Sequence, residues 1–134
     1  MVHKEYRSLN YYAQTFRDFI QGLEEDERGK KKRSEHIYKL IGTDLQTREI
    51  HAEHHASKVS FNAFGIEGVV EFVLKNDVPY ASLEIYSENG SSDSYEKKLK
   101  VSRSKKGRIN VEKTYVPFFE EFIIPHLREA LKEK

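Results

Sequence analysis

The sequence predicts an α+β domain with an N-terminal helix, a mainly antiparallel sheet of five to seven strands in a meander, and a C-terminal helix. Near both ends of the chain, large apolar side chains recur three or four residues apart. Between these regions, apolar and polar residues alternate, and clusters of glycine, asparagine, aspartate and serine separate the alternating runs. The length of 134 residues is common for one domain, so residues 1–134 are expected to share one core.

The first helix is predicted from one apolar stripe. Its members lie three or four residues apart and are Leu9, Tyr12, Phe16, Phe19, Ile20 and Leu23. We expect the helix to end near Gly29, because the charged residues at 24–27 and 30–33 offer nothing apolar to bury and glycine suits a helix C-terminus.

Residues 34–56 are compatible with two structures. The apolar residues at 37–41 fit a short helix capped by Ser34 or a strand ending at Gly42, and we favour the strand. Residues 47–56 also fit either a helix or a strand, and neither period is the better match.

From residue 58 the pattern is typical of strands joined by short turns. Val59, Phe61 and Ala63 alternate with polar neighbours, and Gly65 and Gly68 indicate a turn. Further strands are expected at residues 69–74, 80–86, 97–103 and 108–113, with turns at 75–77, 88–94 and 104–107. These strands make up a five-strand meander.

A closing helix is predicted from a second apolar stripe. The stripe comprises Phe118, Phe122, Ile123, Leu127 and Leu131. Pro117 suits the first helical position, where a missing amide hydrogen costs little. Pro125 lies inside the pattern and is expected to kink the helix or to split it in two.

Charge is distributed unevenly along the chain, although the net charge is only +1. Residues 44–96 carry three basic and ten acidic side chains, whereas residues 97–113 carry eight basic and one acidic. In the predicted last hairpin, six cations surround the turn: Lys98, Lys100, Arg103, Lys105, Lys106 and Arg108. A basic hairpin of this kind can bind the phosphate backbone of nucleic acid, but lysines on an edge strand also simply discourage aggregation.

A second basic cluster lies at residues 28–39 and would add to this surface only if the fold brings the two together. Four acidic residues at 24–27 immediately precede it.

Three histidines, His51, His54 and His55, lie close together in the sequence. On a helix they would share one face, as a metal site needs, whereas on a strand His54 would point away from the other two. The order of residues is not that of a zinc-protease motif. We favour a polar surface segment, or a segment that responds to pH, over the metal site.

The sequence favours a non-catalytic protein without a cofactor. It contains no cysteine and no phosphate-binding glycine-lysine loop, nucleophile elbow or dinucleotide fingerprint, although catalysis from scattered residues stays open. Charges at the N-terminus and the lack of a long apolar run lead us to expect a cytoplasmic protein that does not span a membrane.

The first functional hypothesis is therefore a binding or regulatory module that contacts nucleic acid through the basic hairpin. The first alternative is a protein-interaction or self-associating adaptor, which would use an exposed edge strand or a tyrosine-rich sheet face carrying Tyr80 and Tyr86. The second alternative is a metal-dependent enzyme built on the three histidines.

Overall fold

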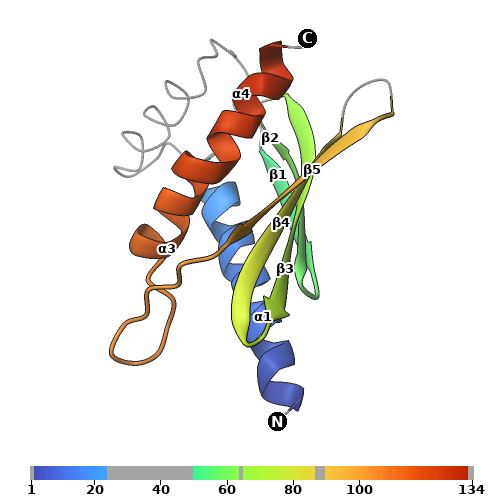
Figure 1. Ribbon diagram of the computed structural model, residues 1–134. Coiled ribbons are helices and arrows are strands. Elements are labelled where there is room, and N and C mark those ends of the chain that lie inside the picture. Colours follow the sequence, from blue (N-terminus) through green and yellow to red (C-terminus); the bar gives the residue numbers. More distant parts are fainter. Residues whose placement is uncertain (1, 24–49, 64, 87–89, 133–134) are drawn as a thin grey trace.

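The computed structural model describes residues 2–23, 50–63, 65–86 and 90–132, and shows a sheet packed against helices (Figure 1). The elements in chain order are α1 (Val2–Gly22), β1 (His51–His55), β2 (Lys58–Ala63), β3 (Ile66–Lys75), β4 (Val78–Tyr86), β5 (Ser92–Lys98), α3 (Val111–Phe118), the π-helix η1 (Phe119–Ile123) and α4 (Ile124–Lys132). Within the described ranges, no helix is both long and apolar enough to cross a lipid bilayer.

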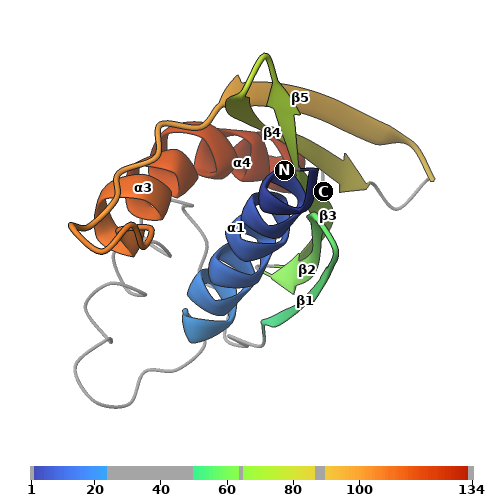
Figure 2. The same cartoon turned by 90° about the horizontal axis from the view of Figure 1, so that it is seen from below.

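The sheet is an antiparallel meander, as predicted. Its spatial order is β1-β2-β3-β4-β5, so each strand pairs with its neighbours in sequence. Helix α1 and the C-terminal helices lie on the same face of the sheet, and no described element covers the other face (Figure 2). The fold class is therefore α+β, with one buried and one open sheet face.

The buried side chains form one hydrophobic cluster between the sheet and the helices. Phe16 of α1 lies at its centre, with ring centroids 5.7 Å from Phe72, 5.3 Å from Tyr115 and 5.8 Å from Phe118. Tilted and edge-to-face contacts at these distances are the favourable geometries for aromatic pairs. The predicted stripe of α1 thus packs against both β3 and α3.

The central strands were predicted correctly because their side chains alternate between the two faces. In β2, Val59, Phe61 and Ala63 are buried while the residues between them are exposed. The turn between β3 and β4 has positive φ at Asn76 (52°) and Asp77 (64°), as a tight two-residue hairpin turn requires.

The prediction for Gly68 was wrong, whereas Gly65 does lie in a turn with φ of 75°. Gly68 is a residue of β3, where it stands opposite Phe61 on one side and Ile85 on the other. A Cβ atom there would lie 2.6 Å from Cζ of Phe61 and 3.0 Å from the carbonyl oxygen of Glu84. The glycine makes room for a buried aromatic ring.

The predicted end of the first helix was also wrong, since α1 ends at Gly22 rather than near Gly29. The amide of Leu23 donates to the carbonyl of Ile20 at 3.1 Å, a tightened last turn that buries Leu23. Residues 51–55, which fitted helix or strand, form β1. The predictions for residues 34–49 and for the basic cluster at 28–39 lie outside the described residues.

The last predicted hairpin is not a pair of strands. β5 begins at Ser92, inside the predicted loop, and ends at Lys98, and α3 begins at Val111 inside a predicted strand. The alternation around Leu99 was misleading, because Leu99 makes the last backbone bond to β4, through the carbonyl of Pro79 at 2.9 Å. Asn110 then caps α3 by accepting the amide hydrogen of Lys113 at 3.1 Å.

The C-terminal helix is interrupted, as the position of Pro125 predicts. The π-helix η1 directly precedes α4, in which Pro125 is the second residue. A π-helical turn is one way for a helix to accommodate a break in its hydrogen-bond ladder. Pro117 lies inside α3 rather than at its first position, because the Asn110 cap starts the helix earlier.

Candidate functional site

The basic residues predicted as a site gather mainly on the segment 99–110, which we call the basic loop and which connects β5 to α3. Leu99 and Ile109 are buried at its two ends, and one isolated β-bridge joins Arg103 to Ile109. The amide of Ser104 donates to the carbonyl of Arg108 at 2.8 Å. The predicted turn at 104–107 is thus present, but it belongs to a loop and not to the sheet.

The two helices anchor the basic loop from both sides. The hydroxyl of Tyr11 in α1 accepts the amide hydrogen of Ile109 at 3.1 Å. Thr114 of α3 binds both backbone groups of Ser102: its Oγ1 accepts the amide hydrogen at 2.9 Å and donates to the carbonyl at 3.1 Å. These contacts fix the backbone path of the loop from which its charged side chains extend.

Arg103 contributes to this anchoring. Its Nη2 donates to the hydroxyl of Tyr12 at 2.7 Å and its Nη1 to the carbonyl of Gly107 at 2.8 Å. The guanidinium carbon also lies 5.6 Å from the centroid of the Tyr12 ring, which is a cation–π distance. Arg103 therefore positions the loop, and both of its terminal guanidinium nitrogens donate within the protein.

The remaining predicted cations fall into two groups. Lys100, Lys105, Lys106 and Arg108 are exposed on the basic loop, and none of them has an ion-pair partner in the part of the chain that the structure describes. Lys98, in contrast, is the last residue of β5 and stands opposite Tyr80 on the open sheet face. The structure thus places five of the six cations on the loop, and four of them are left without a partner among the described residues once Arg103 is set aside as an anchor.

Carboxylates gather on the open face of the sheet. The strand register brings five of them onto this face of the described strands: Glu53, Glu67, Glu71, Glu84 and Glu96. Only three lysines share it, and one of them, Lys75, is already paired with Glu96. The pKa of Tyr86 on this face is raised. The main cause is its hydrogen bond with Glu84, followed by partial burial and by the negative charges of Glu84 and Glu67.

The tyrosines considered as a binding surface do lie on the open face. Tyr86 is the large apolar side chain that the described part of the chain leaves most exposed, at 38%. Tyr80 is half-buried, and the ammonium group of Lys75 lies 5.1 Å from its ring centroid.

The histidine cluster does not have the helical arrangement that a shared metal ion needs. Residues 51–55 form a strand, so His54 faces the opposite way from His51 and His55. The Nε2 atom of His51 lies 3.0 Å from a carboxylate oxygen of Glu53, and both side chains are exposed. Among the residues described, no three histidine, aspartate or glutamate side chains are grouped as metal ligands would be.

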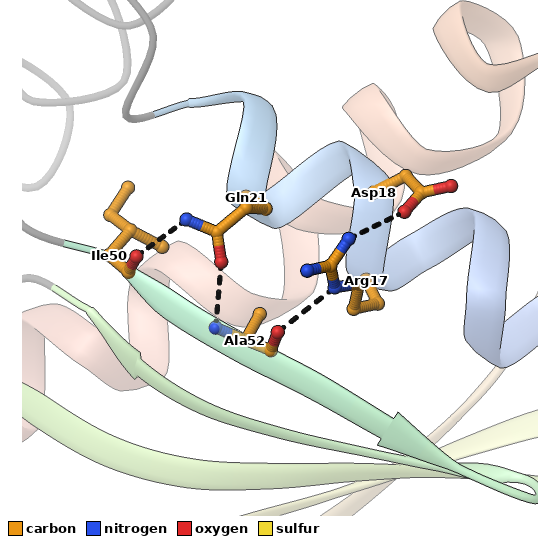
Figure 3. A network of polar contacts seen from close by, with 5 residues as sticks. All are labelled: Arg17, Asp18, Gln21, Ile50 and Ala52. Atoms are coloured by element: carbon orange, nitrogen blue, oxygen red, sulfur yellow. Dashed lines mark hydrogen bonds and ion pairs between the residues drawn. The ribbon is translucent and has the colours of Figure 1, made fainter.

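Sequence reasoning missed a polar contact between α1 and the outer edge of β1 (Figure 3). The side-chain amide of Gln21 donates to the carbonyl of Ile50 at 2.6 Å and accepts the amide hydrogen of Ala52 at 3.0 Å. Nε of Arg17 donates to the carbonyl of Ala52 at 3.0 Å, and Asp18 holds Nη1 of Arg17 at 3.0 Å. The only sequence signal was that Arg17 and Gln21 are four residues apart beside the apolar stripe.

A wide, open cavity of about 350 Å³ lies next to this contact, lined by Gln14, Arg17, Asp18, Ala52, Glu53 and His54. Two of its polar groups, those of Arg17 and Asp18, are already bonded to each other.

No protein-family model, no curated protein and no solved structure matches this chain. The functional argument therefore rests on the chain's own residues.

Proposed function

We propose that this protein is a non-catalytic binding module that contacts the phosphate backbone of nucleic acid through the basic loop. The observation that supports it is the group Lys100, Lys105, Lys106 and Arg108, which is exposed and has no ion-pair partner in the described ranges. Each phosphate that such a cation neutralises releases condensed counterions, and this release favours binding.

The anchoring of the loop adds to the argument. Because Tyr11 and Thr114 bind the backbone of the loop and Tyr12 holds the side chain of Arg103, little backbone entropy is lost when the loop meets a ligand. A solvated edge strand would need no such anchoring to fulfil its protective role.

The distribution of charge would orient the ligand. The open sheet face carries an excess of carboxylates and would repel a polyanion, whereas the loop is bound to α1 and α3, the helices that cover the opposite face. Nucleic acid would then meet the loop and not the sheet.

The chemistry of the loop predicts binding without sequence preference. Residues 99–110 contain no aromatic side chain on which a base could stack, and contacts to phosphate carry no direct sequence information. With about four phosphates contacted on duplex DNA, the slope of log affinity against log salt would be about −3 to −4.

The test is a fluorescence-anisotropy titration of labelled duplex DNA at about 50 mM and about 200 mM salt, the range over which such contacts weaken strongly. The test variant replaces Lys100, Lys105, Lys106 and Arg108 with glutamine and leaves Arg103 in place, because Arg103 holds the loop. A control variant makes the same change in net charge away from the loop, at Lys58, Lys75, Arg128 and Lys132.

The native protein and the control should show salt-sensitive binding, and the loop variant should lose about 100-fold or more of the affinity at low salt. Equal weakening in the control and loop variants would mean that only net charge matters, and absence of binding by the native protein would overturn the proposal.

A further inference from the structure

β5 is an edge strand whose outer backbone groups have no partner among the residues described. Because Leu99 donates to the carbonyl of Pro79, residues 93, 95 and 97 direct their amide and carbonyl groups toward β4. The groups of Ser92, Ser94, Glu96 and Lys98 therefore point to the outside, where β5 is the last strand of the sheet. Figure 2 shows no described element along this side of β5.

The opposite edge of the sheet, at β1, is bonded to side chains of α1. The outward groups of β1 at Ala52 are bound by Gln21 and Arg17, as described above. The fold thus covers one edge at Ala52 with side chains of α1 and leaves the other edge open for pairing with another strand.

The sequence of β5 indicates what kind of strand fits there. In Ser92–Lys98 the acidic Asp93 lies near the start and the basic Lys97 near the end, on the same face and on either side of Tyr95. An antiparallel copy of the same strand would present these charges in reverse order. We propose that two copies of this chain associate by antiparallel pairing of their β5 strands about a two-fold axis at Tyr95.

In this register the charged side chains, the outward backbone groups and the full length of β5 all find partners in the second copy. Asp93 of each copy stands opposite Lys97 of the other, and Ser94 stands opposite Glu96, so the outward backbone groups can bond. All seven residues of β5 take part. Moving the axis by one residue to Glu96 would set the two Glu96 carboxylates directly opposite each other, and moving it to Ser94 would remove the pairing of Asp93 with Lys97.

Tyr95, at the axis, and Lys97, beside it, each contact a C-terminal helical residue, with different strength. The ring of Tyr95 is stacked on His126 of α4, with centroids 3.5 Å apart and planes 20° apart. Nζ of Lys97 lies 4.0 Å from a carboxylate oxygen of Glu121, and the two side chains are 38% and 70% exposed, so this contact is weak and leaves Lys97 able to pair with Asp93 of the second copy.

The test is sedimentation velocity over a range of protein concentrations without nucleic acid, so that it is independent of the polyanion proposal. Three variants are compared with the native chain: Asp93→Lys, Lys97→Asp, and the double variant that exchanges the two charges. Glu67→Lys on β3 is the control, because it makes the same charge change as Asp93→Lys in the middle of the sheet. Circular dichroism checks that each variant is folded.

The native chain and the control should form dimers, and each single variant should raise the dimer Kd about tenfold, because two attractive pairs become two repulsive ones. The charge exchange should restore Kd to within about threefold of the native value. A native chain that stays monomeric, a single variant that dimerises normally, or a double variant that remains weak would each overturn the proposal.

Discussion

At the scale of single residues, Gly68 is a position where the sheet has no room for a side chain. Replacing it with alanine would put a methyl group 2.6 Å from the ring of Phe61, which is buried and enclosed by the core. Overpacking of this kind forces side chains or backbone to shift. Gly68→Ala is expected to lower the free energy of unfolding by about 1–3 kcal/mol, measured by urea denaturation.

The matched control is Gly22→Ala at the end of α1, where an added Cβ meets nothing within 4 Å. This change should be neutral or stabilising by up to about 1 kcal/mol, because alanine favours the helix. Equal stability of the Gly68 variant and the native protein would show that Phe61 can move aside.

His126 is a second residue with a measurable effect, because it is stacked on Tyr95 and makes an edge contact with Phe122. Burial lowers the pKa of His126 below its usual value near 6.5. The unfolded chain therefore binds a proton at a higher pH than the folded chain. The contribution of His126 to stability is fully present above pH 6.5 and is lost as the pH falls through the folded pKa.

His126→Phe keeps a ring for the stack and removes the titration. Its unfolding free energy should fall less than that of the native protein between about pH 7 and pH 5, measured by urea denaturation at several pH values. His54→Gln, at an exposed strand position, serves as the control for the loss of a histidine. A native-like pH profile for His126→Phe would contradict the expectation.

At the scale of elements, Gln21 joins α1 to the edge of β1 by imitating a strand. Its amide makes both bonds that a neighbouring strand would make, to Ile50 and Ala52 (Figure 3). Gln21→Ala would leave a partly buried donor and acceptor unsatisfied, and should lower the free energy of unfolding by about 1–3 kcal/mol.

Gln14→Ala provides the comparison, because Gln14 is an exposed glutamine in the same helix. Its loss should change the unfolding free energy by no more than about 0.5 kcal/mol in the same denaturation experiment. Similar effects for both glutamines would mean that the contacts of Gln21 with β1 add little to stability.

The elements that could be predicted from the sequence are those with a clear buried face. α1, β2, β3 and β4 each place several large apolar residues on one side, so periodicity identifies them. The two edge strands lack this signal: in β1 only Ala52 is buried, and in β5 no residue is fully buried. An edge strand with little apolar content cannot be found by alternation, so the sequence left β1 undecided and placed β5 too late.

At the scale of the whole molecule, the candidate site could be predicted in its chemistry but not in its geometry. The excess of cations at residues 97–113 is visible in the sequence, whereas the role of Arg103 depends on Tyr12, which is 91 positions away. The acidic face likewise appears only when the strand register places carboxylates from four strands together. Tertiary contacts decide which charges are used internally and which are free for a ligand.

The covered edge of β1 also bears on how large an assembly of this chain can become. If both edges of the sheet were open, β5 of one copy could add to β1 of the next, and such a head-to-tail contact does not close on itself. Copies would then polymerise into fibres. Gln21 and Arg17 occupy the outward groups of Ala52, so an incoming strand at β1 would have to displace them, whereas a β5-to-β5 contact consumes the open edge of both copies. Growth through β5 pairing therefore ends at two copies.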